Sequence, residues 1–360
     1  MIEALGEVDW TGLTHAYGSA DDVPDLIRGL LSPDPKQRSE TRHELYSCIA
    51  HQGTRYAASA PAVPFLLALA ADPATPDRSS LIDFLEFMAT GNRRQWTRYP
   101  IADERAQGPS FGLATYDAVA KGIPLFVTLL EDSDAELAVP AAQILAVYPE
   151  HAQHTAPALD RAAADDDAPV AVVTAALLAL GTVAPVGSSA HDGLFLRRLG
   201  DSDGTVRWAA ALATARLRRP TLLAEALVEL CQWADHLADP NHSYSEPWYG
   251  IRENLALGEL AECDPDGQTE RVRRTVDCLL TKVPSSNWHN HLLSVFKYVG
   301  LEWCHWQDII PWADLDPAQR YLVERLCERP DVFADGTAKD CLLWHRLPGT
   351  LTDLRAYAGN

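Results

Sequence analysis

A proline-led apolar segment recurs along this chain of 360 residues, and each copy is followed by a polar break and an aspartate. The clearest copies read "DVPDLIRGLLS", "AVPFLLALAAD" and "GIPLFVTLLED", with prolines at Pro24, Pro64 and Pro124. Proline is tolerated in the first turn of a helix, because the N–H that it lacks would have no intrahelical partner there. Each proline therefore predicts a helix start or a kink common to the copies.

The aspartates recur at a nearly constant distance from these segments. Pro24 lies ten residues before Asp34 and Pro124 ten before Asp134, whereas Asp77 follows Pro64 by thirteen residues. Later aspartates continue the series at Asp167 and Asp203, in steps of 33 and 36 residues. An aspartate at such a position is a favoured helix N-cap, because its carboxylate accepts bonds from unpaired backbone N–H groups. The repeating unit is thus predicted to be a helix, a short polar turn and a capped helix.

The capped helices have a common pattern that resembles HEAT repeats. They read "SDAELAVPAAQIL", "DDAPVAVVTAALL" and "SDGTVRWAAALAT", and the resemblance covers about residues 22–217. The segment "HELYSCIAHQGTRYAASAPAVPFLLAL" also resembles a group of actinobacterial HEAT-repeat proteins. The resemblance implies an all-α protein, a right-handed α-solenoid of about seven to eight helical pairs with a concave binding surface.

The resemblance divides the chain into two stretches of one continuous solenoid. Residues 1–220 are expected to form the N-terminal repeats, with a loop inserted at 91–112. Residues 221–360 are expected to form degenerate helical repeats and a C-terminal cap. HEAT proteins mostly bind proteins, and a few bacterial relatives are DNA glycosylases or bilin lyases, so the fold alone does not assign a function.

Charge and cysteine content narrow the choice of partners. The 30 basic and 50 acidic side chains give a formal charge of −20, so we expect no nucleic acid and favour a basic protein partner.

The seven cysteines form no CxxC pair, which fits reduced thiols in the cytoplasm. The N-terminal "MIEALGEVDW" has no signal-peptide pattern. The long apolar stretch 168–186 is bounded by prolines, so we interpret it as a core helix and expect no membrane segment.

Three segments depart from the repeat and supply the candidate binding residues. The insertion offers Arg93, Arg94 and Trp96, a guanidinium and aromatic combination that suits protein hot spots or anionic ligands. The alternative is a surface loop, folded over the helices and anchored by its tryptophan.

The second segment is "AHQGTRY", in which Gly53 permits a left-handed helix end. Its candidates His51, Gln52 and Tyr56 either bond across an inter-repeat turn or form a cluster near the Arg93 and Arg94 loop.

The third segment is "NHSYSEPWYGIRENL", with candidates Tyr244, Glu246, Trp248 and Arg252. Trp248 and Arg252 are four residues apart and share a face if a helix starts near residue 247. A dense polar and aromatic patch is typical of a binding surface, but an inter-repeat loop pinned by tryptophan fits equally.

Catalytic and metal motifs are weak by comparison. His289 and His291 are two residues apart, and Cys304 and His305 are adjacent, so neither pair has the spacing of metal ligands on a helix. Cys48 lies in an apolar helical context that favours an inert thiol. We therefore assign no catalytic residue, no metal and no cofactor. A glycosylase would use a basic groove, for which the candidates are Arg207, Trp208, Arg216, Arg218 and Arg219.

The sequence thus favours a non-catalytic, protein-binding scaffold that uses its concave face, with an immunity-like or regulator-like partner as one version. The alternative is an enzyme or small-ligand binder whose pocket combines segments 51–56, 91–112 and 241–255.

Overall fold

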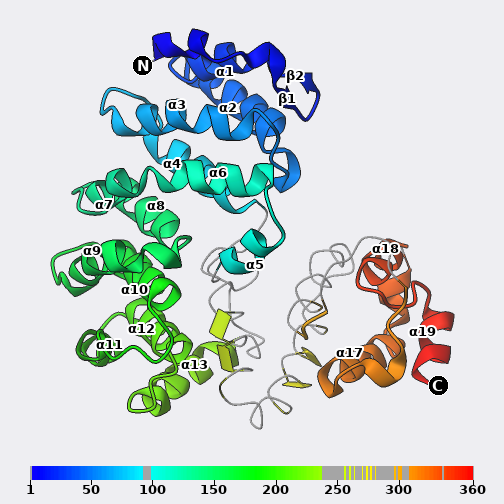
Figure 1. The fold of residues 1–360 in the computed structure, drawn as a ribbon. Helices are drawn as coiled ribbons and strands as arrows, with labels where there is room; N and C mark the ends of the chain where they lie inside the picture. The colour runs from blue at the N-terminus through cyan, green and yellow to red at the C-terminus, as the bar shows by residue number, and fades with distance from the viewer. Residues whose placement is uncertain are drawn as a thin grey trace. The chain divides into compact units, whose positions relative to one another are not determined.

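The structure is a computed structural model that describes residues 2–91, 99–236, 308–334 and 336–359, together with single positions and runs of two or three residues between 255 and 301. These residues are mostly helical, as the sequence predicts (Figure 1). The described strands form one small antiparallel hairpin, β1 (Thr14–His15) and β2 (Gly18–Ser19). The chain divides into two compact units, Met1–Arg219 and Pro220–Asn360.

The first unit contains twelve of the described α-helices. In chain order they are α1 (Val23–Gly29), α2 (Pro35–Ile49), α3 (Ser59–Ala71), α4 (Arg78–Thr90), α5 (Ile101–Ala106), α6 (Phe111–Ala120), α7 (Ile123–Leu130), α8 (Ala135–Leu145), α9 (Ala152–Ala164), α10 (Val170–Val183), α11 (Asp192–Leu199) and α12 (Gly204–Arg216). Short 3-10 helices complete it: η1 (Ile2–Glu7), η2 (Trp10–Gly12), η3 (His51–Gly53) and η4 (Pro149–His151).

Helices of the first unit pack on neighbours that are close in sequence. Helix α1 packs on α2, α3 on α4, α7 on α8, α9 on α10 and α11 on α12. The second members of the later pairs also contact one another in series, α4 on α8, α8 on α10 and α10 on α12. The result is a stack of helical pairs, visible along one side of Figure 1.

The predicted aspartate caps form at three positions. Asp34, Asp134 and Asp203 accept backbone bonds from the helices that follow them, at 2.9, 2.9 and 2.7 Å. The cap prediction is wrong for Asp167, because α10 starts later and its N-cap is Pro169. Asp77 stands at the N-cap of α4 in a left-handed conformation, but it makes no capping bond and pairs instead with Arg38 at 2.8 Å.

The prolines occupy two kinds of position. Pro24 and Pro124 lie in the first turns of α1 and α7, as predicted. Pro64, by contrast, lies inside α3, and Pro140 lies inside α8. An interior proline has no N–H to donate, so the carbonyl four residues earlier loses its α-helical hydrogen bond.

The core of the stack is built from small and branched apolar side chains, and α10 is buried from Val172 to Val183. Its contact with α12 is so close that a Cβ atom added to Gly181 would lie 2.5 Å from the Cα atom of Ala213. Glycine at position 181 is therefore required by the distance between these two helices.

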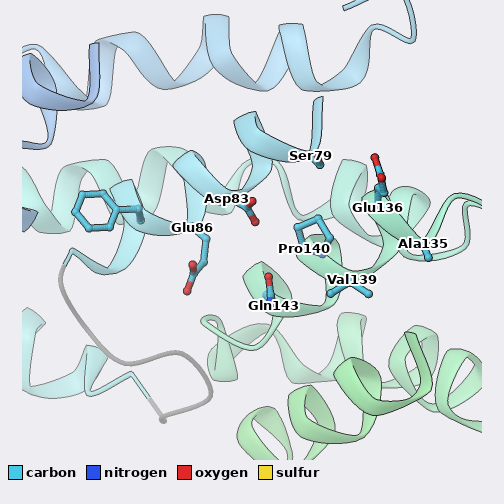
Figure 2. Close-up of a pocket in the computed structure, with 9 residues that line it drawn as sticks. Ser79, Asp83, Glu86, Ala135, Glu136, Val139, Pro140 and Gln143 are labelled. Atoms are coloured by element: carbon cyan, nitrogen blue, oxygen red, sulfur yellow. The ribbon is translucent and has the colours of Figure 1, made fainter. Parts of the chain in front are cut away.

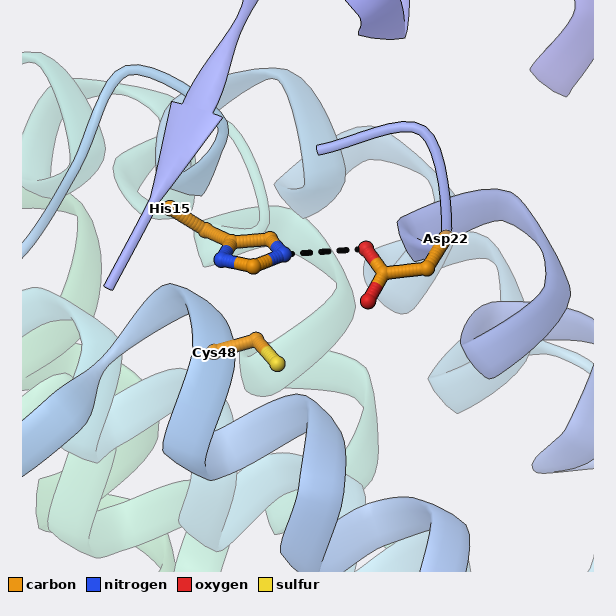
Figure 3. A group of neighbouring side chains, drawn as sticks. All are labelled: His15, Asp22 and Cys48. Atoms are coloured by element: carbon orange, nitrogen blue, oxygen red, sulfur yellow. Dashed lines mark hydrogen bonds and ion pairs between the residues drawn. The ribbon is translucent and has the colours of Figure 1, made fainter. Parts of the chain in front are cut away.

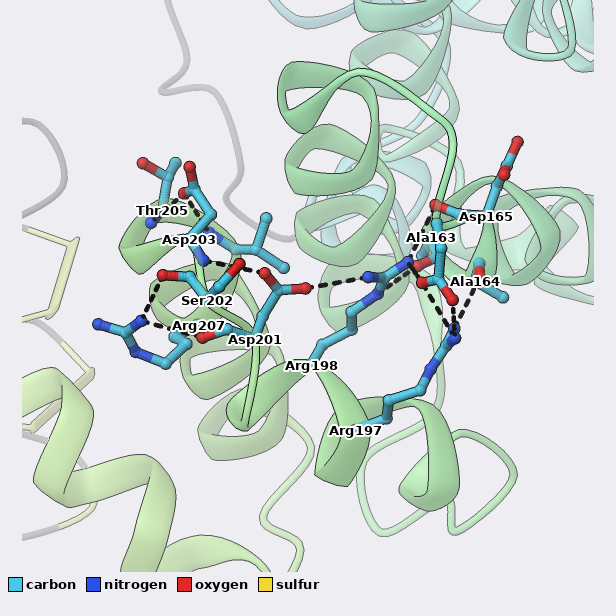
Figure 4. A network of polar contacts seen from close by, with 12 residues as sticks. Ala163, Ala164, Asp165, Arg197, Arg198, Asp201, Ser202, Asp203, Thr205 and Arg207 are labelled. Atoms are coloured by element: carbon cyan, nitrogen blue, oxygen red, sulfur yellow. Dashed lines mark hydrogen bonds and ion pairs between the residues drawn. The ribbon is translucent and has the colours of Figure 1, made fainter.

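Arginines connect the turn of one pair to the turn of the next (Figure 4). Arg197 contacts the carboxylate of Asp166 at 3.0 Å. Arg198, which is only 5% exposed, donates to the carbonyls of Ala163 and Asp165 and pairs with Asp201 at 3.0 Å. A buried guanidinium is costly unless its N–H groups are paired, and these partners meet that need.

The second unit has its own apolar core. Its described helices are α13 (Leu223–His236), η5 (Trp312–Asp314), α17 (Pro317–Cys327), η6 (Pro330–Phe333), α18 (Thr337–Trp344) and α19 (Leu351–Ala358). Leu322, Leu326, Cys341 and Leu354 are fully buried there or nearly so, and Trp312 packs edge-on against Tyr357.

A membrane-spanning helix was not expected, and the described residues contain no single helix that is both long and apolar enough for that role. Helices α6 and α7 pass the length and composition criteria only when taken together, across a bend of 51°. The stretch 168–186 contains α10, whose side chains are buried against other helices.

Candidate functional site

Two adjoining grooves on the second helices of the first pairs form the candidate functional site. The first groove lies between α2 and α4 and has a volume of about 460 Å³. It is lined by side chains of both helices, namely Ser39, Arg42, His43, Tyr46, Ser80, Asp83, Phe84 and Phe87. The α2 residues follow the i, i+3, i+4, i+7 spacing, so they occupy one face of that helix.

The second groove lies between α4 and α8 and has a volume of about 610 Å³ (Figure 2). It is lined by Ser79, Asp83, Glu86, Phe87, Ala135, Glu136, Val139, Pro140 and Gln143. Three of these nine side chains are carboxylates and none is basic. The described lining of this groove is therefore electronegative.

Asp83 and Phe87 belong to both grooves, so the face of α4 that carries them separates the two. The Asp83 carboxyl group remains accessible to solvent, and within the described part of the chain it makes no hydrogen bond or ion pair. Partial burial raises the pKa of Asp83, and the nearby charge of Arg42 opposes that shift without cancelling it. The carboxylate is thus held in an environment that favours the arrival of a positive group.

Aromatic rings form the wall of the first groove. The ring centroids of Tyr46 and Phe87 lie 4.6 Å apart, and those of Tyr46 and Phe84 lie 5.9 Å apart. Burial raises the pKa of the Tyr46 phenol, so this side chain is neutral at physiological pH. Planar aromatic faces next to carboxylates suit cationic side chains, which stack on the rings and pair with the acids.

The segment "AHQGTRY" has a different environment, at the turn after α2. The His51 ring packs edge-on against Tyr17, whose hydroxyl lies 3.2 Å from Nδ1 of His51. Gln52 is exposed and has a φ of +50°, a strained value for a residue other than glycine. Gly53 takes the expected left-handed conformation, and the backbone N–H of Tyr56 donates to the Ser59 hydroxyl at 2.7 Å. The His51 ring thus contacts the N-terminal hairpin, and the Tyr56 backbone contacts the start of α3.

Arg55 connects this turn to the insertion that begins at Gly91. Its guanidinium donates to the carbonyl of Gly53 and occupies space beside Gly91 and Gly112. A Cβ atom on Gly112 would lie 2.8 Å from Nη2 of Arg55, so the glycines at both ends of the insertion make room for this side chain. The structure therefore brings residues 51–56 next to the base of the insertion.

Among the described residues of the insertion, Tyr99 is buried and not a surface contact. Its ring stacks on Tyr116 with centroids 5.0 Å apart, and Tyr116 contacts Tyr148 in turn at 4.5 Å. Tyr116 also donates to the Glu150 carboxylate at 2.8 Å. This tyrosine cluster attaches the middle of the insertion, at Tyr99, to the core.

The remaining predicted binding residues lie outside the described part of the chain. They are Arg93, Arg94, Trp96, Tyr244, Glu246, Trp248 and Arg252.

A third group of polar side chains lies near the N-terminus, where Asp22 is exposed and His15 and Cys48 are buried (Figure 3). Ligand atoms of His15, Asp22 and Cys48 lie within 4.8 Å of one another. The backbone N–H of Tyr17 donates to Nδ1 of His15 at 3.0 Å, so the proton of the neutral ring is on Nε2, which faces Asp22 at 3.0 Å.

This arrangement joins the hairpin to α1 and does not suit a metal ion. Coordination through Nε2 would move the ring proton to Nδ1, where it would meet the Tyr17 N–H. Burial, with the negative charges of Asp22 and Glu44, raises the pKa of the Cys48 thiol to about 11. A neutral thiol is a poor metal ligand and a poor nucleophile, in agreement with the inert role predicted for Cys48.

Three residues of the basic cluster near the end of the first unit make contacts within the fold or are buried. Arg219 pairs with Asp192 at 2.8 Å, and Arg207 donates to the carbonyls of Asp201 and Ser202 (Figure 4). Trp208 is only 2% exposed. The groove that a glycosylase would need is not supported at these residues.

The grooves themselves were missed by the sequence reasoning, which looked for departures from the repeat. Their residues are inside the repeat, on the second helices. A stripe of polar and aromatic residues at helical spacing, such as Ser39, Arg42, His43 and Tyr46, was the available signal.

Comparison with known proteins adds no assignment to this geometry. No protein-family model matches the chain, and no curated protein sequence matches it either.

Proposed function

We propose that the chain is a non-catalytic scaffold that binds a protein partner, built as a right-handed α-solenoid of about seven to eight HEAT-like helical pairs. In this proposal α2, α4 and α8 contribute to its concave face. The serial packing of α4, α8, α10 and α12 supports the solenoid, because second helices in such an array line one surface.

One observation carries the functional part of the proposal. Helices α2 and α4 each keep polar and aromatic side chains along one accessible face, and α8 adds Glu136 and Gln143 among apolar neighbours. These faces line two adjoining grooves that have Asp83 and Phe87 in common. Aromatic residues beside charged ones, in shallow connected grooves, are typical of a surface that binds a protein segment.

The partner would carry positive charge at the point of contact. The acidic character of the chain steers such a partner toward the surface and selects against acidic competitors. An immunity-like or regulator-like pairing is the biological form that this chemistry fits.

The proposal is tested by blocking one groove without disturbing the core. Ser39 is exposed on α2 and lines the first groove, so Ser39→Trp fills it. Ser189→Trp places the same bulk on an exposed loop of the same unit and is the matched control.

The measurement is affinity capture of the tagged protein from its source lysate, followed by crosslinking and mass spectrometry. We expect one stoichiometric partner, with crosslinks to α2, α4 or α8. Ser39→Trp is expected to lose this partner and Ser189→Trp to retain it. Equal capture by both variants, or crosslinks confined to other elements, would show that the grooves do not bind the partner.

A further inference from the structure

The charge and the lining of the groove between α4 and α8 indicate which side chain of the partner it binds. We propose that this groove receives an arginine side chain of the protein partner, held between the carboxylates of Asp83 and Glu136 and the ring of Phe87. This inference rests on the proposed function and identifies which group of the partner is recognised.

The charge of the groove is the first argument. Asp83 comes from α4 and Glu136 from the first turn of α8, on opposite walls (Figure 2). Neither carboxylate has a hydrogen bond or an ion pair to any described residue. Arg42, on α2, lies 3.8 Å from Asp77 and lines only the other groove, where its charge also acts on Asp83.

The second argument comes from the proline inside α8. Pro140 lines the groove and has no N–H, so the backbone carbonyl of Glu136 receives no α-helical hydrogen bond. The amide of Gln143 lies one turn further along the same helix and also lines the groove. The Gln143 amide oxygen thus accompanies the carboxylates as an uncharged acceptor, as a ligand with several N–H donors requires.

The spacing of the acceptors favours a guanidinium over a metal ion. In the described part of the chain, only His15, Asp22 and Cys48 have three ligand atoms within 4.8 Å of one another, so the groove carboxylates do not converge on one point. A guanidinium presents five N–H donors around a plane and therefore reaches acceptors that are spread apart.

The aromatic ring in the groove favours arginine over lysine as the bound side chain. Phe87 is half-buried and lines the groove beside Asp83. A guanidinium stacks on such a ring while its edges pair with carboxylates, whereas an ammonium group is a compact point charge. The groove, at about 610 Å³, has room for one long side chain and the backbone next to it.

The test uses arrays of immobilised ten-residue peptides with randomised backgrounds and one fixed central residue. The central residue is arginine, lysine, or citrulline, which keeps the shape of arginine without its charge. The intact chain, labelled with a fluorophore, is applied as wild type, as Asp83→Asn and as Glu136→Gln. Asp21→Asn is the matched control, because Asp21 is exposed, makes no described ion pair and lies outside both grooves.

For the wild type and Asp21→Asn, we expect arginine peptides to bind about tenfold more tightly than citrulline peptides, and lysine peptides to fall between them. Asp83→Asn and Glu136→Gln are expected to reduce that ratio to near one. The inference is overturned if no peptide class binds, if the arginine preference survives both groove variants, or if Asp21→Asn removes it equally.

The two proposals fail in distinguishable ways. If Ser39→Trp abolishes capture of the partner while the arginine preference is unaffected by Asp83→Asn, the scaffold stands and the arginine contact is wrong. If Ser39→Trp leaves capture unchanged, the proposed function fails, whatever the arrays show.

Discussion

The close contact between α10 and α12 gives the sharpest test of the packing. Gly181→Ala adds a Cβ atom that would lie 2.5 Å from the Cα of Ala213 and 2.8 Å from its Cβ, whereas carbon atoms in ordinary contact are about 3.5–4.0 Å apart. The obstructing Cα belongs to the backbone of α12, so a change of rotamer cannot relieve the overlap. The two helices must therefore move apart by about 1 Å.

Two opposing effects set the magnitude. Alanine in a helix interior is favoured over glycine by about 1 kcal/mol. Overpacking a core by one methyl group typically costs about 1–3 kcal/mol, and an overlap with backbone belongs at the upper end. We expect Gly181→Ala to lower the free energy of unfolding by about 1–2 kcal/mol, which for a unit of this size corresponds to about 2–8 °C in the melting temperature.

Gly193→Ala is the matched control, because it lies in the first turn of α11 and an added Cβ meets nothing within 4 Å. This variant is expected to leave stability unchanged or to raise it slightly. Differential scanning calorimetry gives the melting temperatures, and hydrogen exchange locates any loss of protection in α10 and α12. If Gly181→Ala is as stable as Gly193→Ala, the described distance between the helices is wrong.

Three further predictions concern caps, charge and thiols. Asp203→Ala removes a cap from α12 and is expected to destabilise the first unit by about 1 kcal/mol in urea unfolding. Asp167 caps no helix, so Asp167→Ala should change the free energy of unfolding by less than about 0.5 kcal/mol. Equal losses in the two variants would contradict the cap assignment. Arg219 lowers the pKa of Asp192 through their hydrogen bonds, so this pair stabilises the fold above the unfolded carboxyl pKa of about 4 and ceases to do so as pH falls. Arg219→Gln should therefore be less stable than wild type at pH 7, with the difference disappearing below about pH 4, and a difference that is constant with pH would rule this out. Burial raises the pKa of the Cys341 thiol to about 12 and that of Cys48 to about 11. At pH 8 iodoacetamide should therefore modify these two cysteines only in denaturant, and peptide mass spectrometry measures the extent of labelling at each. Rapid labelling in the native protein would show that they are accessible thiolates.

The helical content and the turns were predictable because they depend on local chemistry. Proline at Pro24 and Pro124 marks a helix start, and aspartate at Asp34, Asp134 and Asp203 caps the next helix. The prediction failed at Asp167, where Pro169 follows closely and the helix begins after it. A regular spacing identified the turn correctly but not which of its residues caps the helix.

The candidate site was less predictable because it depends on which faces remain accessible after packing. Asp83 lies in the middle of α4, and nothing local shows that its groove exists, since that environment arises from α2 and α8 on either side. Tyr99 shows the same limit, because it lies in the insertion but is buried and stacks on Tyr116. Sequence pattern alone does not show whether such a ring faces solvent or the core.

The arginine contacts between turns have a consequence for how the chain is made. Arg38 pairs with Asp77 across 39 positions, Arg161 with Glu131 across 30 and Arg197 with Asp166 across 31, so each link joins one pair of helices to the next. Contacts of such limited sequence separation form with little loop-closure entropy, and domains generally fold in order during synthesis. A nascent chain can therefore complete each pair of helices soon after it leaves the ribosome, on a neighbour that is already folded, before the second unit has been translated.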